Sequence, residues 1–434
     1  MTNPKRERIF TNYEAFVIAL LAFLQFTIVL DFMVLSPLGP FLMEELTISP
    51  SQFGWVVSAY AFSAGIAGLL AAGFADRFDR KKMLLFFYAG FMIGTILCAV
   101  ANDYHFLLVA RIITGLFGGV IGSVSFAIIT DLFKWEVRGR VMGFVQMAFA
   151  ASQVLGLPIG LVLSNQFGWH SPFWMISIVG IMVGGIIAIY MRPIADHLQL
   201  QTQKNAFKHL STTVSNPTYL KAFLATTLLA TGGFMLMPFG SAFSVYNLGL
   251  TMAQLPLLYG ITGAFNFLAG PLVGRLADKT GKFPVFVGGT ILSIIIVLVY
   301  TNLGVTPLWA IIILSVIMFV GITSRMISSS ALLSAVPDQR DRGAFMSISS
   351  SVQQISGGIA SAIAGMIVVQ EGTGPLLHYP ALGITVVVTM VISIILMNLI
   401  NTKVTGPTRP DAQPASPRPA APGAPAPVAT VVES

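Results

Sequence analysis

A single carboxylate stands inside the first long apolar run of the sequence. Asp31 lies in "TIVLDFMVLSPLGP", residues 27–40, with apolar residues on both sides. A carboxylate in hydrocarbon is costly, and such groups usually face the interior of a helix bundle, where they mark ion or proton pathways. Burial favours the neutral carboxyl, and a nearby cation favours the charged form. Asp31 is therefore a candidate proton-coupling residue. The alternative is a structural hydrogen bond or a fixed ion pair.

Two arginines also lie inside apolar runs. At a rise of about 1.5 Å per residue, Arg111 and Asp31 fall at similar depths, so they could pair. A permanently charged guanidinium would then favour the charged form of Asp31. Otherwise Arg111 only holds helices together by donating to backbone carbonyls. Arg325 has no obvious acidic partner. It either meets an anionic or strongly polar substrate group, or is neutralised by carbonyls, neighbouring hydroxyls and water.

Further polar, aromatic or flexible side chains within the runs suggest a mixed polar and aromatic substrate cavity. Polar groups inside spans tend to face the protein interior, and methionine adapts to irregular surfaces. Each of them alone packs more often than it binds a ligand. The candidates are Tyr60, Gln146, Gln153, Phe234, Met235, Met237, Asn266, Gln353 and Gln354.

The elements that position these residues are predicted to be membrane helices. The chain of 434 residues is 55% hydrophobic and only 9% charged, against about 25% charged in soluble domains. Runs of about 20 apolar residues can span a bilayer as helices. They are too long for barrel strands and lack two-residue alternation, so we expect an all-α membrane protein. Twelve candidates occur at 13–40, 52–75, 83–101, 106–130, 141–165, 171–191, 219–245, 254–277, 284–303, 308–333, 344–369 and 379–400.

The net charge of +7 is explained by membrane topology rather than by nucleic-acid binding. Apart from Arg111 and Arg325, every Lys and Arg lies in the terminal segments or near alternate loops. This positive-inside pattern places both termini in the cytoplasm. The first run reads as a retained anchor, without a cleavable signal peptide. The Pro- and Ala-rich segment 404–434 is predicted to be a disordered tail. A lone Cys98 excludes an intrachain disulfide.

The chain also contains an internal repeat. Residues 30–82 align without gaps to 232–284, and "VRGRVMG" at 137–143 resembles "DRGAFMS" at 341–347. Two parallel six-helix halves around a midplane cavity are a transporter architecture. We therefore predict an N-terminal half (1–191), a cytoplasmic linker (192–218), a C-terminal half (219–403) and the tail. Asp31 corresponds to Gly233, so only one half carries the acid.

Several of these motifs resemble the major facilitator superfamily. "AGFADRFDRKK" from Ala72 and "GRLADKTGK" from Gly274 look like two copies of its cytoplasmic loop signature. "RIITGLFGG" from Arg111 and "LGLPIGLVLSNQFGWHSPF" from Leu155 resemble the span 4 and span 5 signatures of its twelve-span drug:proton antiporters, most like arabinose-efflux-permease relatives. The resemblance implies a gating latch in the loop and, with the helix-bending Pro158, a gating bend in span 5. The residues implied are Asp76, Arg77, Arg80, Lys81, Asp278, Gly156, Pro158 and Gly160.

We therefore expect a secondary transporter in a bacterial inner membrane that exports a small organic or amphiphilic solute in exchange for protons, as a monomer among lipids. Alternatives are a facilitator or symporter for a polar or anionic solute, in which Asp31 is structural, and a non-transporting sensor. No cofactor, metal or nucleic acid is expected. "GRLADKTGK" lacks phosphate-loop spacing, and no histidine pair has metal-ligand spacing.

Overall fold

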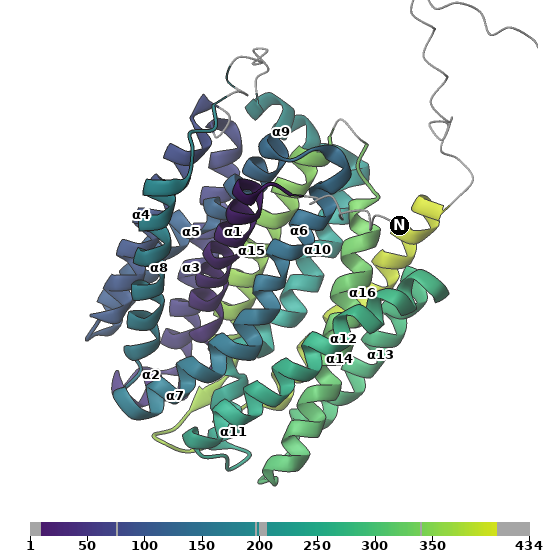
Figure 1. The fold of residues 1–434 in the computed structure, drawn as a ribbon. Coiled ribbons are helices and arrows are strands. Elements are labelled where there is room, and N and C mark those ends of the chain that lie inside the picture. The colour runs from purple at the N-terminus through teal and green to yellow at the C-terminus, as the bar shows by residue number, and fades with distance from the viewer. Residues whose placement is uncertain (1–9, 75–76, 196–197, 199–205, 339–340, 406–434) are drawn as a thin grey trace, which may run out of the picture.

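The computed structural model describes residues 10–74, 77–195, 198, 206–338 and 341–405. Long α-helices run through one elongated bundle (Figure 1). Those of the N-terminal half are α1 (Asn12–Val34), α3 (Pro50–Phe74), α4 (Arg80–Ala99), α5 (Tyr104–Leu132), α6 (Trp135–Ala151) with α7 (Leu157–Phe167), and α8 (Ser171–Tyr190). Those of the C-terminal half are α10 (Pro217–Leu236), α12 (Leu255–Thr280), α13 (Lys282–Tyr300), α14 (Leu308–Ser334), α15 (Arg342–Ile367) and α16 (Tyr379–Thr405).

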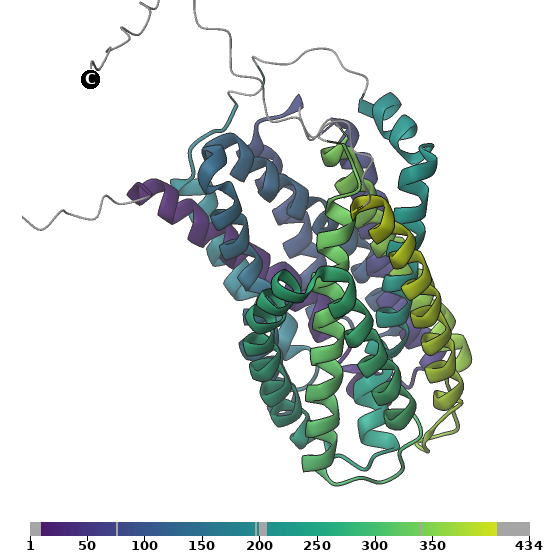
Figure 2. The same ribbon diagram turned by 90° about the vertical axis from the view of Figure 1, so that its right-hand side faces the viewer.

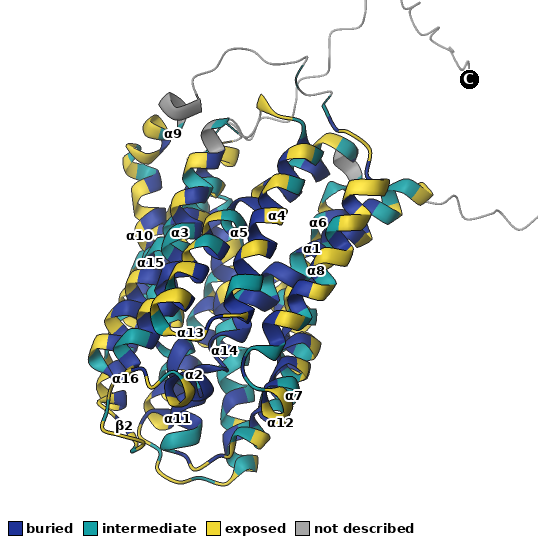
Figure 3. Ribbon diagram, turned by 90° about the vertical axis from the view of Figure 1, so that its left-hand side faces the viewer, coloured by how far each residue is buried: buried dark blue, intermediate teal, exposed yellow. Residues whose placement is uncertain are grey.

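The helices confirm the predicted all-α membrane fold. Within the described chain, 11 helical segments are long and apolar enough to cross a membrane. The remaining predicted span, 344–369, corresponds to α15, a helix of 26 residues. It is rich in serine and packs most extensively against α3 and α10. Exposed residues concentrate on the outer faces of the bundle, where an apolar surface suits lipid (Figure 3).

Three predicted spans are interrupted rather than continuous. The first ends at Val34 and resumes as the short α2 (Gly39–Glu45), with Pro37 in the intervening turn. The seventh breaks at the 3₁₀ turn η4 (Met237–Phe239), which contains Pro238, and resumes as α11 (Gly240–Tyr246). The fifth contains a π-helical turn, η2 (Ser152–Gly156), between α6 and α7. Proline cannot donate a backbone hydrogen bond, which accounts for each interruption near these prolines and near Pro158.

The two ends of the bundle carry different elements. One end, here called the hairpin end, carries α2, α11, the 3₁₀ turn η5 (Met252–Gln254) and an antiparallel pair of strands, β1 (Val369–Gln370) and β2 (Leu376–Leu377). The other, the basic end, carries the start of α1, the end of α16 and α9 (Ala206–Val214). Helix α9 lies within the predicted linker and contacts α3, α10 and α15. The predicted tail lies outside the described residues, apart from 404 and 405.

The apolar core joins the two halves at the hairpin end and separates towards the basic end. One buried cluster includes Leu38 and Phe53 together with Phe239 and Leu255, from both halves. Towards the basic end, a second buried cluster draws its residues from the N-terminal half and a third from the C-terminal half. Helix α1, in purple, leans outward at this end in Figure 2.

Polar contacts across the halves reinforce the closure of the hairpin end. Ser36 Oγ donates to the carbonyl of Met237, and Ser241 Oγ donates to the carbonyl of Ser36 at 2.8 Å. Asn165 Nδ2 donates to the carbonyl of Met252 at 3.2 Å. The structure is therefore closed between the halves at this end.

Candidate functional site

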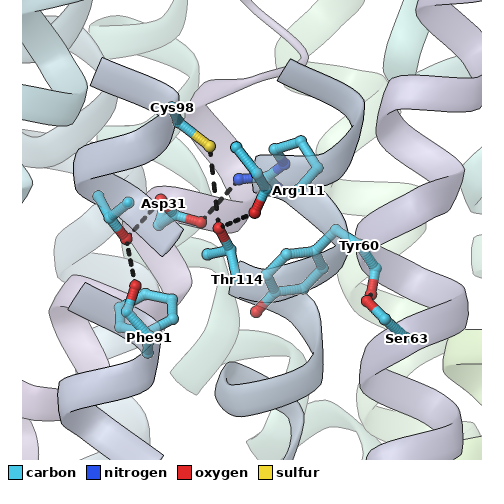
Figure 4. Close-up of polar contacts among 9 residues, drawn as sticks. Asp31, Tyr60, Ser63, Phe91, Cys98, Arg111 and Thr114 are labelled. Atoms are coloured by element: carbon cyan, nitrogen blue, oxygen red, sulfur yellow. Dashed lines mark hydrogen bonds and ion pairs between the residues drawn. The ribbon is translucent and has the colours of Figure 1, made fainter. Parts of the chain in front are cut away.

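Asp31 and Arg111 form a buried ion pair between α1 and α5 (Figure 4). Arg111 Nη1 donates to Asp31 Oδ2 at 2.8 Å, and the side chains are 1% and 0% exposed. Thr95 Oγ1 donates to the second carboxylate oxygen at 3.2 Å. The ion pair neutralises both charges, which burial would otherwise penalise heavily. The depth argument from the sequence thus placed two residues together that lie 80 positions apart.

The guanidinium of Arg111 retains unused binding capacity. Its Nε has no acceptor among the described residues. Its Cζ lies 4.6 Å from the ring centre of Tyr60, within the range of a cation–π interaction. Cys98 Sγ lies 3.8 Å from Thr114 Oγ1 in the same cluster. Arg111 therefore has aromatic support, which would remain if Asp31 lost its charge.

Close helix packing positions this pair. A Cβ at Gly115 would lie 2.3 Å from the carbonyl oxygen of Tyr60, and one at Gly94 would lie 2.7 Å from the backbone nitrogen of Thr114. Glycine at these positions lets α5 approach both α3 and α4, as small residues do in membrane bundles. Arg111, on α5, is thereby held against Tyr60 and Asp31.

The π turn η2 packs against α1, the helix that carries Asp31. A Cβ at Gly156 would lie 2.5 Å from the side chain of Leu30, the residue before Asp31. Ser152 Oγ donates to the carbonyl of Phe26, also on α1, at 3.2 Å. The turn η2 also contacts α12 of the C-terminal half. Pro158 and Gly160 follow η2 in α7. A π turn thus precedes Pro158 and lies between α1 and the C-terminal half, and a gating role for this bend stays a prediction.

The predicted cavity residues separate into two groups and several isolated positions. Gln153 accepts a hydrogen bond of 2.7 Å from Asn266, which in turn accepts one from Thr323. Tyr60 packs on Phe32, and Phe32 packs on Phe234, with ring centres 5.3 and 5.9 Å apart. Both groups cross between the halves. Of the other candidates, Met235 is buried, Met237 and Gln354 are half-buried, and Gln146 and Gln353 are exposed.

Arg325 is buried in the C-terminal half without a hydrogen-bonding partner for two of its nitrogens. It is 5% exposed, and no described residue accepts a hydrogen bond from Nε or Nη2. The hydroxyls expected to neutralise it bond elsewhere: Thr323 to Asn266, and Ser329 to the carbonyl of Met326. Ser328 Oγ is itself without a partner in this part of the structure. Arg325 thus differs from Arg111 and Arg80, whose buried guanidinium groups each pair with a carboxylate.

The predicted loop latch makes contacts within the N-terminal half. Arg80 Nε pairs with Asp131 Oδ2 at 2.9 Å, and Lys81 Nζ donates to the carbonyl of Ala188 at 2.9 Å. Arg77 and Asp278 are exposed. Asp76 lies outside the described residues. Asp79, in the same loop, caps α4 by accepting from the backbone N–H of Lys82 and also accepts from that of Ile194.

Sequence reasoning missed the polar residues that complete these sites. Thr95, Thr114 and Asp131 were not selected. Thr95 contacts Asp31 and Asp131 contacts Arg80, whereas Thr114 contacts Cys98. Thr95 and Thr114 gave no signal, because hydroxyls commonly bond to their own helix in membrane spans. Asp131 had a signal, since it lies close to the basic loop that starts at Lys134.

Comparison with known proteins decides the family. The sequence matches the Major Facilitator Superfamily over residues 21–336 and 222–431. The chain belongs to this superfamily. Among the curated members that resemble it, the uncharacterized MFS-type transporter YceJ of Bacillus subtilis is 30% identical. That match covers 62% of this chain and 68% of YceJ. A probable sugar efflux transporter of Helicobacter pylori is 24% identical over 77% and 82%.

The superfamily fold is also found by structural comparison. A bacterial homologue of the human lysosomal transporter Spinster, crystallised in an inward-facing and occupied conformation, superposes with a TM-score of 0.70. The match is 18% identical and covers 90% of this chain and 97% of the other. At 18% identity the match supports the fold of this chain and no shared function. The protein is thus a multi-pass membrane transporter.

Proposed function

We propose that this transporter exports a small organic or amphiphilic solute in exchange for protons, by alternating access. The observation that carries the proposal is the ion pair of Asp31 and Arg111, buried where the aligned repeat has Gly233. A buried carboxylate beside a fixed cation can take up a proton only if its surroundings change. Such a residue can link proton occupancy to the conformation of the protein.

The contacts around the pair suggest how that link operates. Protonation of Asp31 removes the only ion-pair partner of Arg111 among the described residues, leaving Tyr60 as its neighbour. The attraction between α1 and α5 then weakens. Because η2 packs on α1 at Leu30 and also contacts α12, a shift of α1 reaches the C-terminal half. Proton binding thereby biases the rocking of the two halves.

The charge distribution orients the cycle. The positive-inside rule puts the basic end, with both termini, in the cytoplasm of a bacterial inner membrane. The hairpin end then faces outward, and its closed core corresponds to an inward-facing state. A proton arriving from outside must reach Asp31 in the opposite state, in which the hairpin end is open. The resemblance to an efflux transporter supports export as the direction.

A second candidate function is facilitated transport or symport with Asp31 as a structural residue. The complete burial of both ion-pair members favours it, since neither is open to solvent in this structure. In that case the pair would hold α1 against α5 without exchanging protons. The two candidates differ in whether Asp31 is needed for gradient-driven transport.

Proteoliposomes with an imposed pH gradient separate the two candidates. Candidate solutes of positive, zero and negative charge are added while a trapped pH dye reports proton movement. We expect a transported solute to move protons in the wild type, and Asp31→Asn to retain exchange of solute without proton movement. The matched control is Glu44→Gln, an exposed acid in α2, which should behave as the wild type. Full gradient-driven transport by Asp31→Asn would assign the structural role.

A further inference from the structure

The unpaired guanidinium of Arg325 lies within the C-terminal half, among α10, α14 and α16. A Cβ built at Gly232, on α10, would lie 3.8 Å from Nη2 of Arg325 and 3.4 Å from Thr389 Oγ1 on α16. Behind it, Gly289 of α13 packs on α14, since a Cβ there would meet the backbone nitrogen of Arg325 at 3.4 Å. The arginine is therefore held by packing, and its Nη2 lies beside Gly232.

The surroundings supply no negative charge. The acids in the described C-terminal half are Asp278, Asp338, Asp341 and Glu371, which all belong to helix ends or loops. None forms an ion pair with Arg325 in the described chain. The nearby hydroxyls of Ser324 and Thr389 donate to carbonyls of their own helices, at 2.8 and 2.7 Å. Protein groups thus leave the charge uncompensated.

A second unused donor lies on the same helix. Ser328 follows Arg325 by three residues, which places both on one face of α14. It is 0% exposed, and its Oγ has no partner among the described residues. Buried polar groups are normally hydrogen-bonded, so two adjacent unused donor groups need an acceptor from elsewhere. The contrast with Arg111, whose charge Asp31 neutralises, makes the absence specific to this half.

We propose that Arg325 binds the oxyanion head of the transported solute, with Ser328 as a second donor. A guanidinium presents paired N–H groups that match a carboxylate, sulfonate or phosphate. The solute class is then an anionic amphiphile, because the proposed cargo also has an apolar part. This inference rests on the proposed transport function for its claim that the anion is cargo.

The test measures binding, independently of transport. Purified full-length protein in phosphatidylcholine nanodiscs is titrated with octyl phosphate, octyltrimethylammonium, octanol or inorganic phosphate at constant ionic strength, and the thermal unfolding midpoint is followed. We expect octyl phosphate alone to raise the midpoint. Arg325→Gln should weaken its binding by about 10- to 100-fold, the range for hydrogen bonds to charged groups. Arg325→Lys should retain part, and the exposed control Arg342→Gln should change nothing.

Two milder variants keep the test informative if Arg325→Gln fails to fold. Gly232→Ala places a methyl beside Nη2 and should weaken octyl phosphate binding, whereas Gly233→Ala, with nothing within 4 Å, should not. Ser328→Ala should weaken it less than Gly232→Ala does. Equal protection by inorganic phosphate would show a free-anion site and overturn the assignment to cargo. Equal protection by octyltrimethylammonium, or octyl phosphate binding that survives Arg325→Gln, would overturn the site itself.

These outcomes are separate from those of the proposed function. If octyl phosphate does not raise the unfolding midpoint, but another solute still moves protons through Asp31, this inference is overturned and proton-coupled export stands. An intact anion effect, with Asp31→Asn still driven by the pH gradient, does the reverse.

Discussion

Breaking the Asp31–Arg111 pair from one side should cost far more than removing it from both. Asp31→Asn leaves a 1% exposed guanidinium without its carboxylate, and Arg111→Gln leaves a 0% exposed carboxylate without its cation. Loss of one partner of a buried pair typically costs about 3–5 kcal/mol, whereas replacing both is often nearly neutral. The ion pair therefore makes Asp31→Asn a destabilising substitution as well as a functional one.

A double-mutant cycle tests this reasoning. Reversible unfolding in mixed micelles would be followed by tryptophan fluorescence for the wild type, both single variants and the double variant. We expect each single variant to lose about 3–5 kcal/mol and the double variant to lose far less than their sum. The cation–π contact with Tyr60 should make Asp31→Asn the milder single variant. Additive losses across the cycle would refute the claim that the pair is a mutual charge compensation.

Three further predictions follow from the packing. Asp131→Asn should destabilise the protein by about 1.5–3 kcal/mol, because buried Arg80 loses its carboxylate; an unchanged denaturation midpoint would contradict this. Gly365→Ala should lower the melting temperature and expose the hairpin end to thiol labelling, because the added Cβ would meet the carbonyl of Pro50 at 2.9 Å. The control Gly343→Ala, whose Cβ has nothing within 4 Å, should do neither. Gly263→Ala should slow transport by pushing α12 from the carbonyl of Gln153, 2.9 Å from the added Cβ; wild-type rates would count against a close contact in the cycle.

The helices were predictable because lipid as solvent demands long apolar runs with internal hydrogen bonds. The amphipathic α15 was also found, although its serines lower its hydropathy. The interruptions of the first and seventh spans were not predicted, since Pro37 and Pro238 could each kink a helix or end it. The short α2 and α11 result from tertiary packing at the hairpin end, which hydropathy does not encode.

The site was predictable where a charged residue carried the signal. Asp31, Arg111 and Arg325 could be selected because charge in a span is rare, and depth along the helices correctly paired the first two. The amide candidates were less informative: Gln153 and Asn266 meet, whereas Gln146 and Gln353 are exposed. Which face an amide occupies depends on helix rotation, and the sequence of a mostly apolar helix specifies rotation weakly.

Infrared difference spectroscopy of the carboxyl C=O stretch tests most directly whether Asp31 exchanges a proton. Full-length protein in lipid would be titrated with pH, and spectra of the wild type compared with those of Asp31→Asn and Glu44→Gln. The proposed mechanism predicts a protonated-carboxyl band that appears on acidification in the wild type and Glu44→Gln and is missing in Asp31→Asn. If no band depends on Asp31 at any pH at which the protein remains folded, Asp31 is a fixed ion-pair member and the proton-coupled mechanism is wrong.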